Sequence, residues 1–406
     1  MILMEVNSDL HIHSRYSAAT SNQMNFPVLT EWASKKGIEL IGTGDCLHPK
    51  WLDEVRALER IDDGTFVVGN THFVLTCEVE DSNRVHHLLI LPSISKAEEL
   101  HDKFANYSPN INSEGRPKIN LGGEQIAEHV QEAGALFGPC HAFTPWTSMY
   151  AYFNGIKECY GSMASHVSFI ELGLSADSDY ADRIEELKDL TFLTNSDAHS
   201  PWPIRLAREF NRFKLESITY AELEKAILRV QGRGPLLNVG LPPEEGKYNE
   251  SACIRCYKHY TFKECLANNW KCLCGGKIKK GVRDRVNELA DYEEPKHPLH
   301  RPAYLKLIPL IEIIALALNA KLNSRVVMDA WNALMTKFGN EVKVLVDTKT
   351  TKPDTINPSI YEAIMAFRNG QIIFFPGGGG QYGHVELLGR ESMSKNIAPQ
   401  SSLFDF

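Results

Sequence analysis

The sequence predicts an α/β barrel, followed by a small zinc-binding module and a mainly helical C-terminal domain. Short apolar strands alternate with helical stretches up to about residue 232, which is the pattern of a parallel α/β barrel or sheet. Four cysteines then cluster between Cys253 and Cys274, and a largely helical region runs from Pro302 to Phe338. A chain of 406 residues exceeds one ordinary core, so two or three domains are expected.

The domain boundaries are placed where the composition changes. The segment 233–252 is rich in glycine, proline and polar residues, which is typical of a linker. The predicted order is a barrel at 1–232, a linker at 233–252, a zinc-binding module at 253–294, a helical or mixed C-terminal domain at 295–390, and a flexible tail at 391–406.

Apolar runs and helical periodicity predict the individual elements. After a first strand at the amino terminus, we expect barrel strands at 39–42, 73–77, 85–91, 135–137, 167–171 and 191–194. Helical patterns lie at 26–36, 124–133, 181–188 and 220–230. A β-like segment is expected at 341–346, after the helical region.

Composition limits the classes of protein that remain. Hydrophobic residues make up 43% and charged residues 23%, as in a folded soluble protein. No run of about 18 uncharged apolar residues is present, so no membrane partner is expected. The nine cysteines are an odd number and cluster locally, which favours a metal site in a reducing compartment over a disulfide framework. We therefore expect a cytoplasmic protein.

Charge is unevenly distributed. The net charge of −8 argues against polyanion binding by the whole surface. Residues 247–285, however, hold ten lysines or arginines against three acids, a net charge of +7. Four thiolates around one zinc ion would leave this segment at about +5, which suits binding to phosphates. A solvated surface without a ligand is the alternative explanation.

Histidines and acids recur where the predicted strands begin or end. His11 and His13 are two residues apart, so on a strand they would share a face. Six strand edges in succession carry such residues. They are His11 and His13, Asp45 and His48, Glu78, His86 or its neighbour His87, His141, and Asp197 with His199.

This set of side chains suits a polynuclear metal centre. Imidazoles and carboxylates bind Zn²⁺, Mn²⁺, Mg²⁺ or Fe²⁺, and a bridging carboxylate can hold two ions about 4 Å apart. Such centres hydrolyse phosphoesters, because the ions activate water and stabilise charge on the phosphate. Glu171 also ends a strand near this set, and helix capping, substrate contact and metal ligation all remain open for it.

These motifs resemble the nine-ligand pattern of the polymerase-and-histidinol-phosphatase (PHP) superfamily. The resemblance implies a distorted (β/α)₇ barrel with up to three divalent ions. It implies a first site of His11, His13, Glu78 and Asp197, a second of Glu78, His86 and His141, and a third of Asp45, His48 and His199. His86 is preferred to His87 because the superfamily's Val-His-x-Leu pattern falls on it. Catalysis is assigned to His11, His13, Glu78, Asp197 and His199.

The clustered cysteines form two pairs that predict a structural zinc site. Cys253 and Cys256 are separated by two residues, and Cys272 and Cys274 by one. A module this small needs such a metal to fold. Because the second pair departs from Cys-x₂-Cys, Cys265 remains an alternative ligand.

A run of four glycines follows two phenylalanines, in FFPGGGGQYG. It lacks the Lys-Ser/Thr of a phosphate-binding P-loop. Either it is a flexible linker, or its backbone approaches a phosphate or a flipped base. The candidate DNA-binding residues of the C-terminal half are Lys277, Lys279, Lys280, Arg283, Arg285, Gly377, Gly378, Gly379 and Tyr382.

Taken together, the barrel motifs with SDAHSPWPIRLAREFN, the cysteine module, HRPAYLKLIPLIEII and PGGGGQYG resemble the endonuclease Q family over nearly the whole chain. The resemblance implies incision of DNA immediately 5′ to uracil, hypoxanthine, xanthine or an abasic site, with the damaged nucleotide in a pocket between domains. Such a protein would be associated with the nucleoid.

The ending QSSLFDF resembles a sliding-clamp peptide, with Gln400, Leu403 and Phe406 as its anchors. A frayed chain end is the alternative. Two other functions use part of the same sequence. A small-molecule phosphatase uses the same ligands but needs no zinc module, and a non-catalytic DNA-binding protein would be expected to have lost some of the nine ligands.

Overall fold

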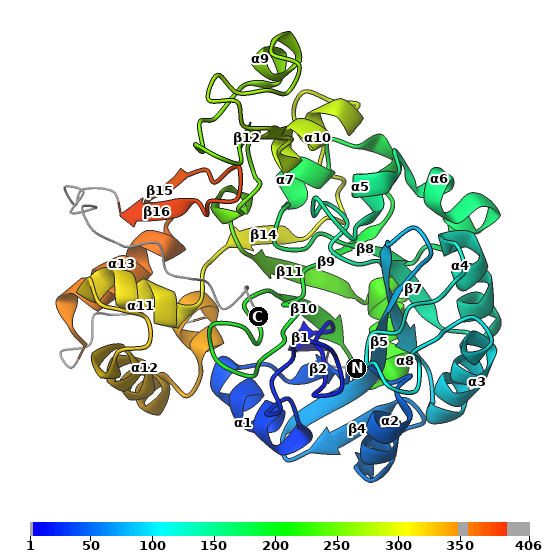
Figure 1. Cartoon of the computed structure of the whole chain (residues 1–406). Coiled ribbons are helices and arrows are strands. Elements are labelled where there is room, and N and C mark those ends of the chain that lie inside the picture. The colour runs from blue at the N-terminus through cyan, green and yellow to red at the C-terminus, as the bar shows by residue number, and fades with distance from the viewer. Residues whose placement is uncertain (1–2, 348–355, 388–406) are drawn as a thin grey trace.

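The computed structural model describes residues 3–347 and 356–387. Its first part is an α/β barrel, as predicted, with helices outside and strands inside (Figure 1). The barrel strands are β1 (Met4–Asp9), β2 (Leu40–Gly42), β5 (Thr71–Glu80), β6 (His86–Leu91), β7 (Leu136–Pro139), β8 (Phe169–Glu171), β9 (Thr191–Leu193), β10 (Phe210–Leu215) and β11 (Gly234–Gly240).

The barrel is distorted because its strands are not all parallel. β1, β2 and β5 run parallel, as do β8 and β9, but β5, β6 and β7 are joined antiparallel. A tight turn separates β5 from β6, in which the Asp81 carboxylate accepts hydrogen bonds from the N–H groups of Asn83 and Val85, both at 2.8 Å. Such a short connection permits only an antiparallel pair. β10 also pairs antiparallel with β1 and with β11.

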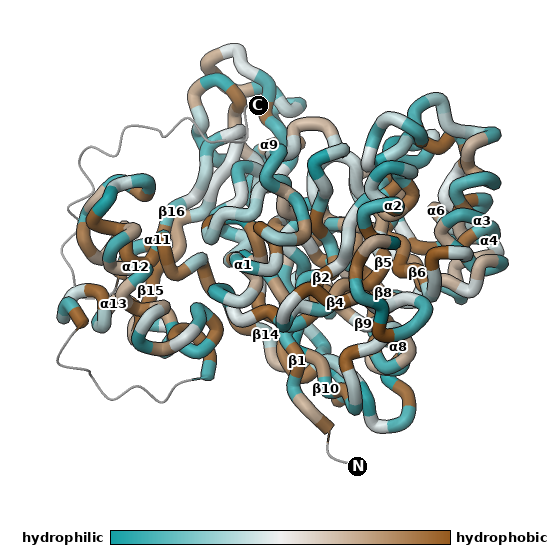
Figure 2. The backbone as a smooth tube through the Cα atoms, turned by 90° about the horizontal axis from the view of Figure 1, so that it is seen from below, coloured by the Kyte–Doolittle hydropathy of each residue, from teal (hydrophilic) through white to brown (hydrophobic). Residues whose placement is uncertain are grey.

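Helices surround the strands and cover the core. α1 follows an Asn25 cap that accepts a hydrogen bond from the Val28 N–H, and it ends at Gly37 with a φ of 88°, as helix caps commonly do. Figure 2 shows apolar segments gathered along the strands and hydrophilic ones in the outer loops. The barrel helices are α1 (Phe26–Lys36), α2 (Pro49–Arg56), α3 (Ile94–Ala105), α4 (Gly123–Glu132), α5 (Met149–Tyr152), α6 (Ile156–Tyr160), α7 (Ser178–Ala181) and α8 (Tyr220–Ile227), and a short hairpin adds β3 (Glu59–Arg60) and β4 (Thr65–Val68).

The prediction of a helix at 181–188 was wrong. The chain there leaves α7 and forms only a 3₁₀ turn at Glu185–Leu187. The carbonyl oxygen of Arg183 accepts hydrogen bonds from the N–H groups of Asp291 and Tyr292, at 2.9 and 3.2 Å, so tertiary contacts replace helical hydrogen bonds at this point.

The predicted linker contains a strand. Residues 234–240 form β11, which pairs with β10 on one edge and with β14 (Ala303–Lys306) on the other. The barrel sheet therefore continues into the C-terminal domain instead of ending at residue 232. The remaining domain boundaries stay predictions.

The cysteine module lies above the barrel in Figure 1. It consists of β12 (Ala252–Cys253), α9 (Phe262–Ala267), β13 (Ile278–Lys279) and α10 (Val282–Leu289). α10 packs on the barrel, where the Arg285 guanidinium donates hydrogen bonds to the carbonyl oxygens of Tyr150 and Phe153, both at 2.9 Å.

The C-terminal domain is mainly helical, as predicted, and lies beside α1 (Figure 1). Its elements are α11 (Leu310–Leu318), α12 (Arg325–Phe338), α13 (Pro358–Arg368), and the antiparallel hairpin of β15 (Ile372–Phe375) and β16 (His384–Leu387).

The prediction of a β-like segment at 341–346 was wrong. Lys343–Asp347 is a π-helical turn. The buried Glu341 carboxylate holds this turn in place, because it accepts hydrogen bonds from the Leu310 N–H at 3.1 Å and the Trp331 indole at 3.0 Å. The same carboxylate pairs with the Lys36 ammonium of α1 at 2.7 Å, so it links the C-terminal domain to the barrel.

We expect Glu341→Ala to destabilise the protein by about 3–5 kcal/mol, because it leaves the buried Lys36 ammonium without its carboxylate. Denaturant unfolding measures the loss. Glu31→Ala is the matched control, since Glu31 forms an exposed pair with Lys35 on the same helix and should cost no more than about 1 kcal/mol. Equal losses in the two variants would show that the buried pair does not join the domains.

Candidate metal centre

The predicted ligands meet at one end of the barrel because two chain segments pair there. Ile12, between the first two histidines, forms a parallel bridge with Ala198. The His13 N–H donates to the Ala198 carbonyl oxygen at 3.0 Å. This pairing brings Asp197 and His199 against the pair of histidines that follows β1.

The first predicted site comes together as a group. The Glu78 carboxylate lies 3.2 Å from His13 Nε2 and 3.8 Å from His11 Nε2. Asp197 Oδ1 lies 3.1 and 3.7 Å from the same two nitrogens. His11 Nε2 is buried and has no hydrogen-bond partner among the described residues. Two carboxylates and two imidazoles directed at one place form a donor set that fits a divalent ion.

The second predicted site also forms a group, on the other side of Glu78. Its Oε1 atom lies 2.7 Å from His86 Nδ1 and 3.0 Å from His141 Nε2. His87 points to the opposite face of β6, where its Nδ1 lies 2.7 Å from the Tyr160 hydroxyl. Of the two adjacent histidines, only His86 is placed to share an ion with Glu78.

The residues expected to form the third site, Asp45, His48 and His199, do not form one group in the structure. His199 groups with His13 and Asp197. Asp45 lies behind His13, with Oδ1 3.1 Å from His13 Nδ1, and the His48 ring stacks on Tyr16 with centroids 4.5 Å apart. The assignment of Asp45 and His48 to a third ion stays a prediction.

Glu171, whose role the sequence left open, orients two ligands. Its carboxylate accepts hydrogen bonds from His11 Nδ1 at 2.9 Å and from the His141 N–H at 3.0 Å. Asn195 donates a third hydrogen bond at 2.9 Å. A carboxylate behind a histidine ligand fixes the orientation of the ring and makes it more basic.

Arg116 is a functional candidate that the sequence did not reveal. Its guanidinium lies 3.2 Å from Glu78 Oε2, at the mouth of the centre. The nearby Glu78 carboxylate raises the pKa of the Arg116 guanidinium above its ordinary value, so the side chain stays charged. Arg116 lies in a loop between α3 and α4, where no helical or strand periodicity singles out a residue. The only signal that could have identified it is the GRPK sequence in which it lies.

Burial and positive charge act against each other on Glu78. Burial opposes its ionisation, but His86 and Arg116 more than offset that effect and hold its pKa well below the usual range. Three residues of the centre also have a strained backbone. Asp45, His141 and Asp197 have φ values of 50°, 28° and 48°, in a region that few residues other than glycine adopt.

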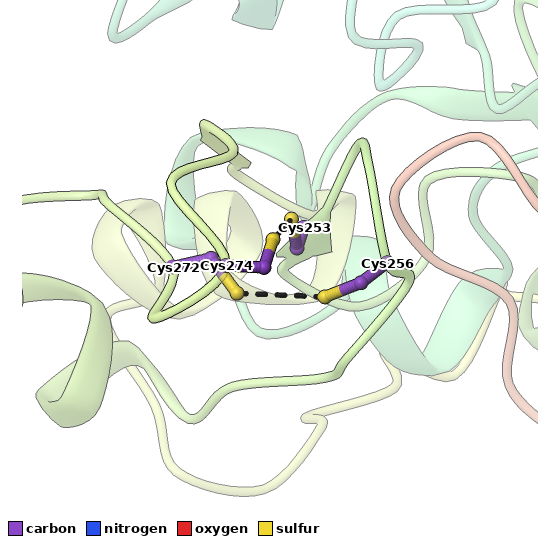
Figure 3. A group of neighbouring side chains, drawn as sticks. All are labelled: Cys253, Cys256, Cys272 and Cys274. Carbon is purple, nitrogen blue, oxygen red and sulfur yellow. Dashed lines mark hydrogen bonds between the residues drawn. The ribbon is translucent and has the colours of Figure 1, made fainter.

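The four predicted zinc ligands of the cysteine module converge. Figure 3 shows their side chains pointing toward one another. The Sγ atoms of Cys253 and Cys274 are 3.6 Å apart, and those of Cys256 and Cys272 are 3.5 Å apart. Tetrahedral Zn–S bonds of about 2.3 Å imply S–S separations of about 3.8 Å, so the group fits zinc.

The remaining contacts separate this group from Cys265. The Tyr260 hydroxyl donates to Cys272 Sγ at 3.0 Å and lowers the pKa of that thiol to about 6, which favours the thiolate that binds metal. Burial raises the pKa of Cys265, which lies outside the group.

Several residues expected to bind DNA contact other parts of the protein. Lys280 and Arg283 form ion pairs with Glu288 and Glu250, each at 2.6 Å, and Arg285 joins α10 to the barrel. The Lys279 ammonium lies over the Trp146 ring. The DNA contacts of these residues and of Lys277 stay predictions.

The glycine run has a packing role. Three N–H groups of the segment 377–383 donate to carbonyl oxygens of the segment 244–247, at 2.8–3.1 Å. A Cβ on Gly379 would lie 2.5 Å from the Cys253 carbonyl oxygen. Glycine is required here because two backbones touch. The DNA contact expected of Gly377, Gly378, Gly379 and Tyr382 stays a prediction.

Two further expectations concern the chain ends and the membrane. The clamp anchors Gln400, Leu403 and Phe406 lie outside the described residues. Within the described residues, no helix has both the length and the apolar character needed to cross a membrane.

The structure thus combines a distorted α/β barrel, with histidine and carboxylate groups gathered at one end, and a four-cysteine module. Residues 309–371 match the family described as the C-terminal domain of MJ0043. The uncharacterized protein MJ0043 of Methanocaldococcus jannaschii is 42% identical over 274 residues, which are 66% of this chain and 34% of that protein. The chain thus spans about a third of this relative's length.

Two solved structures match nearly the whole chain. The lesion-specific endonuclease PfuEndoQ from Pyrococcus furiosus is 48% identical, with a TM-score of 0.91, over 97% of this chain and 98% of that one. A complex of endonuclease Q with a 27-mer duplex bearing an abasic lesion at the active site is 48% identical, with a TM-score of 0.90, over 97% and 100%. The chain belongs to the endonuclease Q family.

We expect Cys253→Ser to lower the zinc content by one equivalent and to weaken DNA binding, because the module folds around its ion. Elemental analysis of the purified protein measures the zinc, and fluorescence anisotropy measures the binding. Cys265→Ser is the matched control and should keep the full zinc content, since Cys265 lies outside the group. A Cys253→Ser protein with unchanged zinc would overturn the ligand assignment.

Proposed function

We propose that this protein is a DNA repair endonuclease that hydrolyses the phosphodiester bond on the 5′ side of a damaged nucleotide. The proposed lesions are uracil, hypoxanthine, xanthine and abasic sites. The 48% identity to an endonuclease whose structure holds an abasic duplex at the active site supports this function.

One observation of the structure carries the proposal. The side chains of Glu78, Asp197 and the histidines around them form three overlapping groups, each suited to an ion, within a single end of the barrel. Overlapping ion sites are the arrangement that clamps both oxygens of a phosphoryl displacement. The basic zinc module beside it gives a reason for the substrate to be a polyanion rather than a small phosphoester.

The protein residues have separate tasks in this reaction. His11, His13, Glu78 and Asp197 would hold one divalent ion, and Glu78, His86 and His141 a second. Zn²⁺, Mn²⁺, Mg²⁺ or Fe²⁺, when bound, would supply an activated water and stabilise negative charge on the phosphate. Glu171 orients His11 through its Nδ1 atom. Arg116 keeps Glu78 ionised and offers its remaining N–H donors to a phosphate oxygen.

The three deaminated bases among the proposed lesions share one chemical change. Deamination replaces an amino donor by a carbonyl acceptor, and in uracil and hypoxanthine it places a hydrogen on the adjacent ring nitrogen. A site that pairs with this edge would leave a buried polar group unsatisfied when cytosine or adenine enters, and such mismatches discriminate strongly. Extrusion of the nucleotide would expose that edge. We further propose that Gln400, Leu403 and Phe406 bind a sliding clamp and that the protein acts in the nucleoid.

We expect Asp197→Ala to lower single-turnover incision of a uracil or abasic duplex by several orders of magnitude in the presence of Mn²⁺, because the variant loses a ligand of the first ion. Gel analysis of a 5′-labelled strand measures the rate and locates the cut. Asp53→Ala is the matched control, since Asp53 is exposed on α2 and its loss should leave incision unchanged.

The same assay tests the competing functions. Undamaged duplexes and a panel of phosphomonoesters are incubated beside the damaged duplexes. Hydrolysis of the monoesters alone would replace the proposal by a small-molecule phosphatase. Tight DNA binding without incision under any divalent ion would favour a non-catalytic binding protein.

We expect Lys277→Glu with Lys280→Glu to weaken binding to damaged and undamaged duplexes alike, because these residues would contact phosphates rather than bases. The slope of log affinity against log salt concentration should fall by about one to two. Anisotropy titrations at several salt concentrations measure both effects. A loss confined to damaged DNA would mean that the two lysines recognise the lesion itself.

A further inference from the structure

Trp146 is a large exposed aromatic residue close to the metal centre. It lies five residues after His141, in the loop that follows β7, and its exposed fraction is 43%. The proposed hydrolysis gives it no task. An indole with so much exposed surface next to a charged centre is available to a ligand with a flat apolar face.

The loop holds Trp146 in a fixed position relative to His141. The Thr144 hydroxyl lies 3.3 Å from His141 Nδ1 and donates to the Trp146 carbonyl oxygen at 2.7 Å. On the other side, the Thr147 carbonyl oxygen accepts from the His86 N–H at 3.1 Å. Two members of the metal centre therefore position the loop, and the indole lies at a set place beside them.

Two other parts of the chain supply neighbours for the ring. The Lys279 ammonium, from β13 of the zinc module, lies 4.4 Å from the ring centroid. The Tyr248 ring meets the indole nearly at right angles, with centroids 4.6 Å apart and an interplanar angle of 85°. The ammonium lies over a face of the ring, so a base stacks on that face once the lysine turns to a phosphate. Aromatic rings combined with cations bind unpaired nucleotides, because the base stacks and the phosphate pairs with the cation.

The junction between the barrel and the zinc module has contacts that do not involve the indole. Arg285 already joins these parts through the Tyr150 and Phe153 carbonyl oxygens. Asn249 adds a hydrogen bond to the Tyr180 hydroxyl at 3.1 Å. The junction therefore has polar contacts of its own, and the contacts of Trp146 with Lys279 and Tyr248 are additional to them.

We propose that Trp146 stacks on a nucleobase next to the lesion and keeps it out of the duplex stack while Lys279 pairs with the adjoining phosphate. This inference rests on the proposed function, and it assigns Trp146 a positioning role for the substrate. Holding a neighbouring base unstacked would give the damaged nucleotide room to leave the helix and bring its 5′ phosphate to the metal centre.

The test compares duplex and single-stranded substrates. We expect Trp146→Ala to slow single-turnover incision of an abasic duplex by about 5- to 150-fold, the range that corresponds to the loss of one stacked base. Incision of the same lesion in a single strand should fall much less, since no duplex stack competes there. Trp146→Phe should restore most of the rate, because it keeps a ring.

A fluorescent base reports the stacking directly. The duplex carries 2-aminopurine next to the lesion, and its fluorescence rises when it leaves the duplex stack and changes again on stacking against a protein ring. We expect the signal on mixing to be altered in Trp146→Ala and kept in Trp146→Phe. Tyr107→Ala is the matched control, because Tyr107 is 41% exposed and lies beside His129 of α4, on the outer helical layer.

Lys279→Met separates the charge from the packing, since it keeps an alkyl chain over the ring. The slope of log affinity against log salt concentration should fall by about one, which corresponds to the loss of one phosphate contact. The 2-aminopurine signal should remain. Zinc content and the unfolding midpoint are measured for every variant. Equal losses on duplex and single strand, or a loss that follows zinc release or unfolding, would overturn the inference in favour of a packing role.

The inference and the proposed function can fail separately. If the unsubstituted protein does not incise the abasic duplex, the proposed function is wrong, and the 2-aminopurine signal still decides whether Trp146 stacks on a base. If the unsubstituted protein incises and Trp146→Ala matches it in both rate and signal, only the inference is wrong.

Discussion

The structure depends on the burial of one carboxylate, that of Glu78. It is 1% exposed, and an isolated charge in such a place would cost several kcal/mol. Four histidine side chains and Arg116 surround it, with His86 at 2.7 Å and Arg116 at 3.2 Å. Because these partners come from separate segments of the chain, the carboxylate is stable only when the barrel has closed. The ligands around Glu78 therefore come together only in the folded barrel.

A second layer of carboxylates keeps the imidazoles in place. Glu171 accepts from His11 Nδ1, and Asp45 lies against His13 Nδ1 at 3.1 Å. Each ring then directs its Nε2 atom toward the centre of the group, where His11 Nε2 has no hydrogen-bond partner among the described residues. The positive φ values of Asp45 and Asp197 show that the backbone is strained to achieve this. The barrel stabilises an arrangement that its local segments would not adopt alone.

Sequence reasoning succeeded where a local pattern carries the information. His11 and His13 flank Ile12, which bridges to Ala198 just after β1, and they join one group as their spacing predicted. The cysteine pairs meet because their spacing suits one ion. It failed after Glu341, where apolar residues suggested a strand but the chain forms a π-helical turn beside the buried Glu341 carboxylate, whose partners are distant in sequence. Arg116 was missed for a related reason, since its importance arises from its proximity to Glu78 and not from its neighbours along the chain.

The basic segment shows how composition can overstate a surface property. Its net charge of +7 suggested a face directed at DNA, yet Arg285 binds barrel carbonyl oxygens and Arg283 pairs with Glu250. Part of this charge fixes the zinc module to the barrel. Under the proposed function, such fixing would be useful, because a rigid frame would keep the phosphate at the metal centre while a base is displaced. The lysines that remain at the edge of this frame would then, under the same proposed function, be the ones that contact DNA.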